Sequence, residues 1–156
     1  MSDGFSHLDA EGSVHMVDVG GKEVTSRRAT AEVVVSMDPI VKDRLFAGDL
    51  PKGDALAMVR VAAIMGAKRT PELVPLCHPI SLDAVTVDIE PVATGARIVV
   101  TATVAARTGV EMEAMTGAAV GAVALYDMIK GLDRAAEIGP LRLLSKSGGK
   151  SGEWNR

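Results

Sequence analysis

Aromatic side chains are scarce in this sequence: only 3% of its 156 residues are Phe, Trp or Tyr, whereas 47% are hydrophobic. A domain of this length can bury a core, but it must build that core from aliphatic side chains. So few aromatic rings also argue against a surface that stacks single-stranded bases. The net charge of −3 provides no broad positive field for nucleic acid. We therefore expect no nucleic-acid partner.

The sequence also has a single cysteine and lacks long hydrophobic runs. Cys77 is the only cysteine, so no internal disulfide can form, which favours a reducing compartment. No stretch approaches the roughly 20 apolar residues of a membrane-spanning helix. The first 20 residues lack the basic and apolar regions of a signal peptide. The sequence thus predicts a cytoplasmic protein with no membrane partner.

Hydrophobic periodicity predicts one α+β domain over residues 1–156, with flexible segments at 1–14 and 148–156. In chain order, the predicted elements are a strand at 29–37, helices at 39–47 and 54–69, strands at 82–90 and 97–106, a helix at 109–132 and a strand at 136–147. This order is the ferredoxin-like pattern, in which an antiparallel sheet carries helices packed on one face. The uncovered sheet face and the small residues of the long helix favour an oligomer.

The segment "PLCHPI" (75–80) places Cys77 beside His78 between two prolines. Zinc needs about four ligands, and adjacent side chains of an extended segment point in opposite directions. Neither a metal site nor a thiol–imidazole pair is therefore favoured. The prolines stiffen the loop, and a stiff loop that presents one imidazole suits ligand contact. The alternative is that His78 is an ordinary polar loop residue.

The segment "KSGGKSG" (146–152) resembles part of a phosphate-binding loop. However, Leu144 stands where that motif requires a glycine, and too few residues follow for the helix that the motif also needs. Lysines among glycines can still hold phosphate; a solvated tail is the alternative. Lys52, in the turn "KGD", would by itself be a typical surface lysine.

Charged residues lie at both ends of the predicted long helix. Glu111 and Glu113 fall in its first turn, where carboxylates are favourable with the helix dipole in any case. Asp127 and Lys130 share a helix face and could merely pair. Glu113 and Asp127 are separated by about 21 Å along the axis. If both serve chemistry, either the ligand is long or the site is shared between subunits.

Taken together, seven segments resemble the molybdenum cofactor biosynthesis protein C family. In chain order they are "HMVDV", "KGD", "AKRT", "LCHPI", "TGVEMEAM", "YDMIK" and "LLSKSGGKSG", which run from His15 to Gly152. Several separate segments in the family's order make the resemblance specific. It implies a ferredoxin-like fold and a lyase activity in an early step of molybdenum cofactor (molybdopterin) biosynthesis.

The resemblance also implies a substrate and an assembly. The implied substrate is 3′,8-cyclo-7,8-dihydroguanosine 5′-triphosphate, a cyclised GTP derivative supplied by an upstream radical GTP cyclase. The implied products are cyclic pyranopterin monophosphate and pyrophosphate. The implied assembly is a homohexamer built from dimers, with the pocket at a dimer interface. The sequence requires no cofactor and indicates no metal site, although Mg²⁺ can accompany the triphosphate.

Site residues follow from the family's motifs. The implied catalytic residues are Asp127, Lys130 and Lys52. The implied substrate contacts are Leu76, Cys77, His78, Met112 and Glu113, with Glu111 and Lys146 as further pocket candidates. A lysine beside a carboxylate can transfer protons during ring opening and rearrangement of the purine. Cationic groups can stabilise the departing pyrophosphate.

Three positions depart from the family's usual pattern. Arg107 precedes "TGVEMEA" where a lysine is expected, and the two side chains are not equivalent at a phosphate. Ile129 stands where a cysteine is frequent, which argues against a catalytic cysteine at that position. Gly66 in "AAIMGAKRT" is displaced from its usual place, which predicts a change in packing.

Two other functions are compatible with parts of the sequence. A non-catalytic, ferredoxin-like nucleotide-binding regulator would keep the anion-binding lysines but would not need Asp127 with Lys130. A purely structural hexamer would leave "KSGGKSG" unexplained. Formation of the pterin product from the cyclised intermediate distinguishes the enzyme from both.

Overall fold

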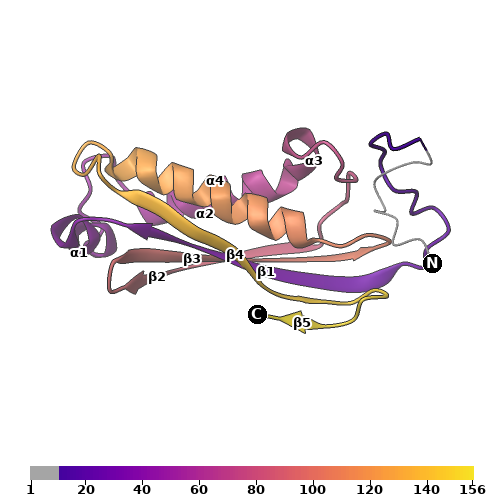
Figure 1. The fold of residues 1–156 in the computed structure, drawn as a ribbon. Helices are drawn as coiled ribbons and strands as arrows, with labels where there is room; N and C mark the ends of the chain where they lie inside the picture. Colours follow the sequence, from indigo (N-terminus) through magenta and orange to yellow (C-terminus); the bar gives the residue numbers. More distant parts are fainter. Residues whose placement is uncertain (1–10) are drawn as a thin grey trace.

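An antiparallel sheet forms the base of the structure, and helices lie across one of its faces (Figure 1). The computed structural model describes residues 11–156, so most of the segment 1–14, predicted to be flexible, lies outside the described residues. The elements are β1 (Thr25–Ser36), α1 (Pro39–Ala47), α2 (Ala55–Lys68), α3 (Thr70–Leu73), β2 (Ala84–Val92), β3 (Gly95–Ala106), α4 (Glu111–Ile129), β4 (Glu137–Ser147) and β5 (Trp154–Asn155). The strand order β2-β3-β1-β4-β5, with all neighbours antiparallel, confirms the predicted ferredoxin-like α+β fold.

The core lies between the sheet and the pair α2 and α4. Alternate residues of the central strands, such as Val33 on β1 and Ile98 on β3, are fully buried, and so are Leu125 and Ile129 on α4. Burying one such side chain stabilises the fold by about 1.5–3 kcal/mol. Aliphatic side chains thus build the core, as the shortage of aromatic residues predicts.

Small residues let α2 and α4 approach closely. A Cβ added to Gly66 would lie 2.7 Å from Val120 Cβ, and one added to Gly117 would lie 3.0 Å from the Ala63 carbonyl oxygen. Gly66 therefore lies directly against Val120 of α4 in the contact between the two helices. By length and composition α4 could cross a membrane, but 44% of its apolar window is buried inside the structure, which is usual for a core helix.

Capping residues stand at the starts of α1 and α2. Asp38 Oδ1 accepts a hydrogen bond from Ile40 N at the start of α1, and Gly48 ends that helix with φ of 73°. Asp54 Oδ1 likewise accepts from Ala57 N at the start of α2. Pro71 follows the end of α2 and lies in the first turn of the short helix α3, where a missing N–H costs nothing.

Strand boundaries differ from the prediction where pairing extends an element. β1 begins at Thr25, four residues before the predicted strand at 29–37, because residue 25 pairs with Ala106 of β3. β2 and β3 continue until only residues 93–94 connect them. β5 lies within the expected polar tail and pairs with β4. Local periodicity contains no signal for such long-range pairing.

A row of alternating charges crosses the sheet face opposite the helices. Glu32 on β1 is buried, and its carboxylate oxygens lie 2.5 Å from Arg97 Nε on β3 and 2.6 Å from Arg142 Nε on β4. Arg97 also pairs with Glu90 on β2. Burial acts to raise the pKa of Glu32, but the hydrogen bonds and charges of the two arginines lower it below its ordinary value. The open face is therefore not an uninterrupted apolar surface.

Candidate active site

The "PLCHPI" loop and the first turn of α4 enclose a cavity of about 450 Å³. Its lining residues are Val17, Val19, Lys22, Leu76, Cys77, His78, Thr108, Gly109, Glu111, Met112 and Glu113. The structure therefore brings together the substrate contacts that the sequence implies at 76–78 and 111–113. Residues 75–76 form a turn, and residues 77–80 have no regular secondary structure. Cys77 and His78 both line the cavity.

Glu113 is the buried acid of the cavity beside the "PLCHPI" loop. Its side chain projects from α4, and the residue is only 3% exposed. Burial, with a smaller contribution from the charge of Glu111, raises the pKa of the Glu113 carboxyl. Burial and the nearby Glu113 likewise raise the pKa of the Cys77 thiol. A thiol that stays protonated is a poor nucleophile, so Cys77 is suited to packing or contact with a ligand.

His78 connects the "PLCHPI" loop to the N-terminal arm, which is the segment 11–24 that precedes β1. Its Nε2 lies 2.8 Å from the Val17 carbonyl oxygen. Because a carbonyl can only accept, Nε2 carries the proton that this hydrogen bond requires. Arg107 fastens the same arm, since its Nε donates to the Lys22 carbonyl oxygen at 3.0 Å. The arm therefore forms one wall of the cavity.

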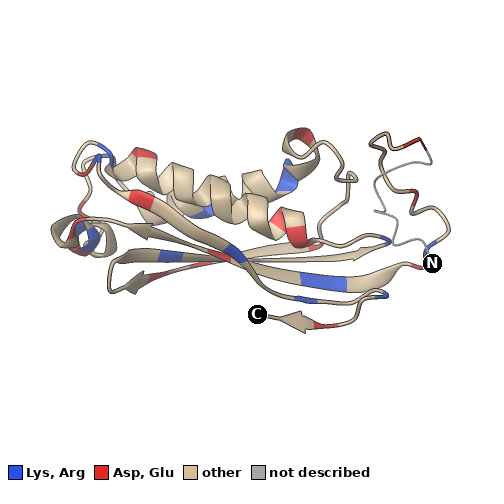
Figure 2. Cartoon of the chain, viewed as in Figure 1, with Lys and Arg blue, Asp and Glu red and all other residues tan. Residues whose placement is uncertain are grey.

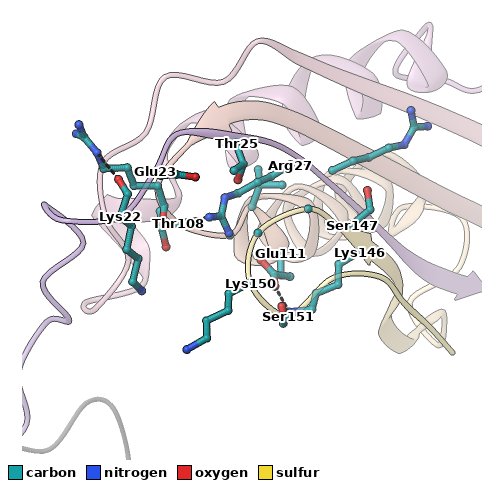
Figure 3. Close-up of a pocket in the computed structure, with 16 residues that line it drawn as sticks. Lys22, Glu23, Thr25, Arg27, Thr108, Glu111, Lys146, Ser147, Lys150 and Ser151 are labelled. Carbon is teal, nitrogen blue, oxygen red and sulfur yellow. Dashed lines mark hydrogen bonds and ion pairs between the residues drawn. The ribbon is translucent and has the colours of Figure 1, made fainter.

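A larger, basic cavity of about 880 Å³ adjoins the first and shares Lys22, Thr108, Gly109 and Glu111 with it. Its basic lining residues are Lys22, Arg27, Arg28, Arg107, Lys146 and Lys150. Figure 3 shows Lys22 on one side of this cavity and Lys146 on the other. Glu23 and Glu111 are the two acidic residues of its lining. The excess of positive charge suits a polyanionic ligand.

Lys146 lies between α4 and the glycine-rich loop. Its Nζ is 3.0 Å from Glu111 Oε1 and 2.9 Å from Ser151 Oγ. Glu111 and Lys146, which the resemblance suggests as pocket candidates, are thus in direct contact. Lys150 lines the same cavity.

No sequence motif identifies the basic residues at positions 22–28 as part of the site. Lys22 precedes β1, Arg27 and Arg28 lie near its start, and all three line the larger cavity. The available signal was "SRRAT" (26–30), where two adjacent arginines enter a β-branched strand. Arg27 is positioned by hydrogen bonds from Nε to the Ala106 carbonyl and from Nη2 to the Arg107 carbonyl.

The three implied catalytic residues form a separate cluster at the other end of α4. Asp127 Oδ1 lies 2.7 Å from Lys130 Nζ, and its Oδ2 lies 2.9 Å from Lys52 Nζ. Hydrogen bonds from Lys130 and Lys52 lower the pKa of Asp127 to about 2. The same contact with Asp127 raises the pKa of Lys130. The Lys130 ammonium is therefore held in its charged form in this arrangement.

Within one copy of the chain, the cluster around Asp127 lies far from the cavity that contains Glu113. Glu113 lies in the first turn of α4 and Asp127 in its last, and the rise of a helix separates them by about 21 Å. Figure 2 shows acidic residues near both ends of this helix. Among residues 11–156, no three His, Cys, Asp or Glu side chains gather where they could hold a metal ion.

The fold and these cavities define a class: ferredoxin-like α+β proteins with an open, mainly basic cavity beside the first turn of α4. The family model of the MoaC family matches residues 16–149. The chain belongs to the MoaC family.

Curated relatives match almost the whole chain and carry one name. A cyclic pyranopterin monophosphate synthase of Corynebacterium efficiens is 53% identical over 151 residues, which cover 97% of each chain. The protein of the same name from Roseiflexus castenholzii is 52% identical over 155 residues, 98% of each. That of Geobacter sulfurreducens is 51% identical over 154 residues, 97% of this chain and 96% of its own.

Proposed function

We propose that this chain is a cyclic pyranopterin monophosphate synthase. It is a lyase that converts 3′,8-cyclo-7,8-dihydroguanosine 5′-triphosphate to cyclic pyranopterin monophosphate and releases pyrophosphate. The observation that carries this function is membership of the MoaC family, with relatives of this name at about half identity over nearly the full length. The activity belongs to molybdenum cofactor biosynthesis. A non-catalytic nucleotide-binding regulator is not favoured.

The basic cavity is suited to the triphosphate. Its volume lies within the range of small-molecule sites, about 300–1,000 Å³, and Arg27, Lys22 and Lys146 line it. An oxygen derived from the sugar attacks the α-phosphorus, and the bond to the bridging oxygen of the β-phosphate breaks. That oxygen leaves as part of pyrophosphate. Fixed cations stabilise the charge that develops on it.

The smaller cavity is suited to the purine-derived end. It joins the basic cavity through shared lining residues, so a single ligand can occupy both. Glu113 and His78 offer hydrogen-bonding groups there, while Leu76 and Met112 offer apolar contact. Burial raises the pKa of the Glu113 carboxyl, so this group holds its proton more tightly than an exposed glutamate and is suited to act as a general acid.

Asp127, Lys130 and Lys52 act as the catalytic unit in this proposal, but they lie at the far end of α4 from both cavities. We place the unit of one copy against the cavities of a second copy, so that each complete site is shared. Exposed apolar residues on α2 support association: Met58, Val61 and Met65 are each about half exposed and lie at helical spacing on one face. A homohexamer of such dimers is the assembly we propose.

Magnesium would enter with the substrate in this proposal. Two or three phosphate oxygens and water can complete its preferred octahedral shell without a protein cage. The substrate would come from an upstream radical GTP cyclase acting in the same cytoplasmic compartment.

The direct test is incubation of the purified protein with the cyclised GTP intermediate. We expect cyclic pyranopterin monophosphate and pyrophosphate in equal amounts. Binding of the intermediate without turnover, with and without Mg²⁺, would instead favour the regulator.

A further inference from the structure

We infer that Ser151 is a positioning residue that holds the Lys146 ammonium at the edge of the basic cavity, ready for a phosphate oxygen. This inference rests on the proposed function, since it assigns Lys146 to the triphosphate end of the substrate. Ser151 Oγ, in the glycine-rich loop, lies 2.9 Å from Lys146 Nζ. Glu111 Oε1, on α4, lies 3.0 Å from the same lysine nitrogen (Figure 3).

The two contacts leave the ammonium with one donor to spare. A lysine ammonium has three N–H groups, of which Glu111 and Ser151 can accept one each. A flexible lysine held by a single, partly exposed ion pair is only weakly restrained. The hydroxyl supplies a second point of attachment. Preorganisation of this kind reduces the entropy lost when an anion binds.

The loop that carries Ser151 is closely fitted to β1. Gly148 and Gly149 both have positive φ, of 91° and 72°, which side chains rarely adopt. A Cβ at Gly148 would collide with the Ser26 carbonyl oxygen, and one at Gly149 would collide with the Arg27 guanidinium. Gly152 N then donates to the Gly149 carbonyl and closes the turn. The glycines thus let the loop approach β1 closely enough for Ser151 to reach Lys146.

The segment after the loop anchors it to the sheet. Trp154 of β5 pairs with Lys146 of β4 itself. Arg156 donates from its backbone N to the Leu144 carbonyl and from Nε to the Leu143 carbonyl, each at 2.9 Å. Its guanidinium also lies 5.9 Å from the Trp154 ring centroid. Ser151 is therefore fixed from both sides, unlike a residue of a solvated tail.

Kinetics of the full-length protein with the cyclised triphosphate test this role. Ser151→Ala should raise KM by about 2–12-fold, the ratio that corresponds to one net hydrogen bond, and should leave kcat nearly unchanged because the contact is made in ground and transition states alike. Ser151→Thr, which keeps the hydroxyl, should restore KM. The dissociation constant of pyrophosphate should follow the same order. Ser36→Ala, at the opposite end of β1, is the matched control.

A double-mutant cycle decides whether Ser151 acts through Lys146. In a Lys146→Ala background, adding Ser151→Ala should change KM little, because the group that Ser151 positions is already absent. An equal KM effect in both backgrounds, or an unchanged KM for Ser151→Ala alone, overturns the inference. A wild-type protein that forms no product would instead refute the proposed function, so the two failures are distinguishable.

Discussion

Lys130 lies one helical turn beyond Asp127, and its Nζ is 2.7 Å from Asp127 Oδ1. The pair is at the surface of a single copy, with the Asp127 side chain 55% exposed. An exposed pair of this kind contributes little to stability. The carboxylate also accepts a hydrogen bond from Lys52, which comes from the turn before α2. Convergence of two cations from separate elements on one exposed acid favours a functional role.

Asp127→Asn should reduce turnover by roughly 10²–10⁴-fold, the usual contribution of a positioned proton-transfer group. The protein should unfold at nearly the wild-type temperature, because the side chain is exposed. Product formation from the cyclised intermediate and thermal unfolding are the two measurements. Asp88→Asn, an exposed acid on β2, is the control. A folded Asp127→Asn protein with near-normal turnover would refute this role.

Lys130→Ala should cause a similar loss, and the combination with Asp127→Asn should be far from additive. Residues that act as one unit fail together, so the second substitution adds little to the first. The measurement is kcat for the two single variants and the double variant. If the two losses simply multiply, the residues contribute independently and do not form a unit.

The ionic state of the catalytic cluster should persist well into acid. Asp127 has a folded pKa of about 2, below its ordinary value near 3.9. Its contribution to stability, which exposure to solvent keeps small, is complete above the ordinary value and is lost as the pH falls through about 2. Carboxyl chemical shifts from pH 1 to 6 would report this titration. A midpoint at or above the ordinary value would show that the lysines do not hold the carboxylate in solution.

The contribution of Glu113 to stability should have the opposite dependence on pH. Because burial raises its folded pKa, its folded state holds the proton more tightly, and stability falls as the pH rises from the ordinary value, near 4.3, through the folded one. The Glu113→Gln variant should not lose stability as the pH rises. At neutral pH it should therefore be more stable relative to wild type than it is at acidic pH, while its activity falls. Urea unfolding between pH 4 and 8 measures it, with exposed Glu137→Gln as control. Parallel profiles for wild type and Glu113→Gln would contradict the raised pKa.

Much of the fold could be predicted because its signals are local. Asp38, Pro39 and Gly48 define α1 by capping chemistry alone, and alternation on β3 identifies the buried face. The start of β1 at Thr25 and the strand β5 depend on partners far away in the sequence. No periodicity within the segments themselves could reveal them.

The candidate site likewise contains some residues that sequence motifs identify and others that only the tertiary structure places. Cys77, His78, Glu113 and Asp127 stand in motifs and could be named from the sequence, although their roles stay predictions. Arg27 has no motif of its own. It lines the basic cavity because β1 pairs with β3, which brings the Ala106 carbonyl within reach of its Nε. Only the tertiary structure supplies this relationship.

Complementation between two inactive variants tests the shared site most directly. Co-expressed His78→Ala and Asp127→Asn chains should recover about a quarter of wild-type activity, because half of randomly formed pairs are mixed and one of the two sites in a mixed pair carries neither change. Asp127→Asn with Lys130→Ala should recover none, since both changes fall in the same half of the site. Absence of recovery from His78→Ala with Asp127→Asn, while native mass spectrometry detects mixed assemblies, would contradict a site shared between two copies.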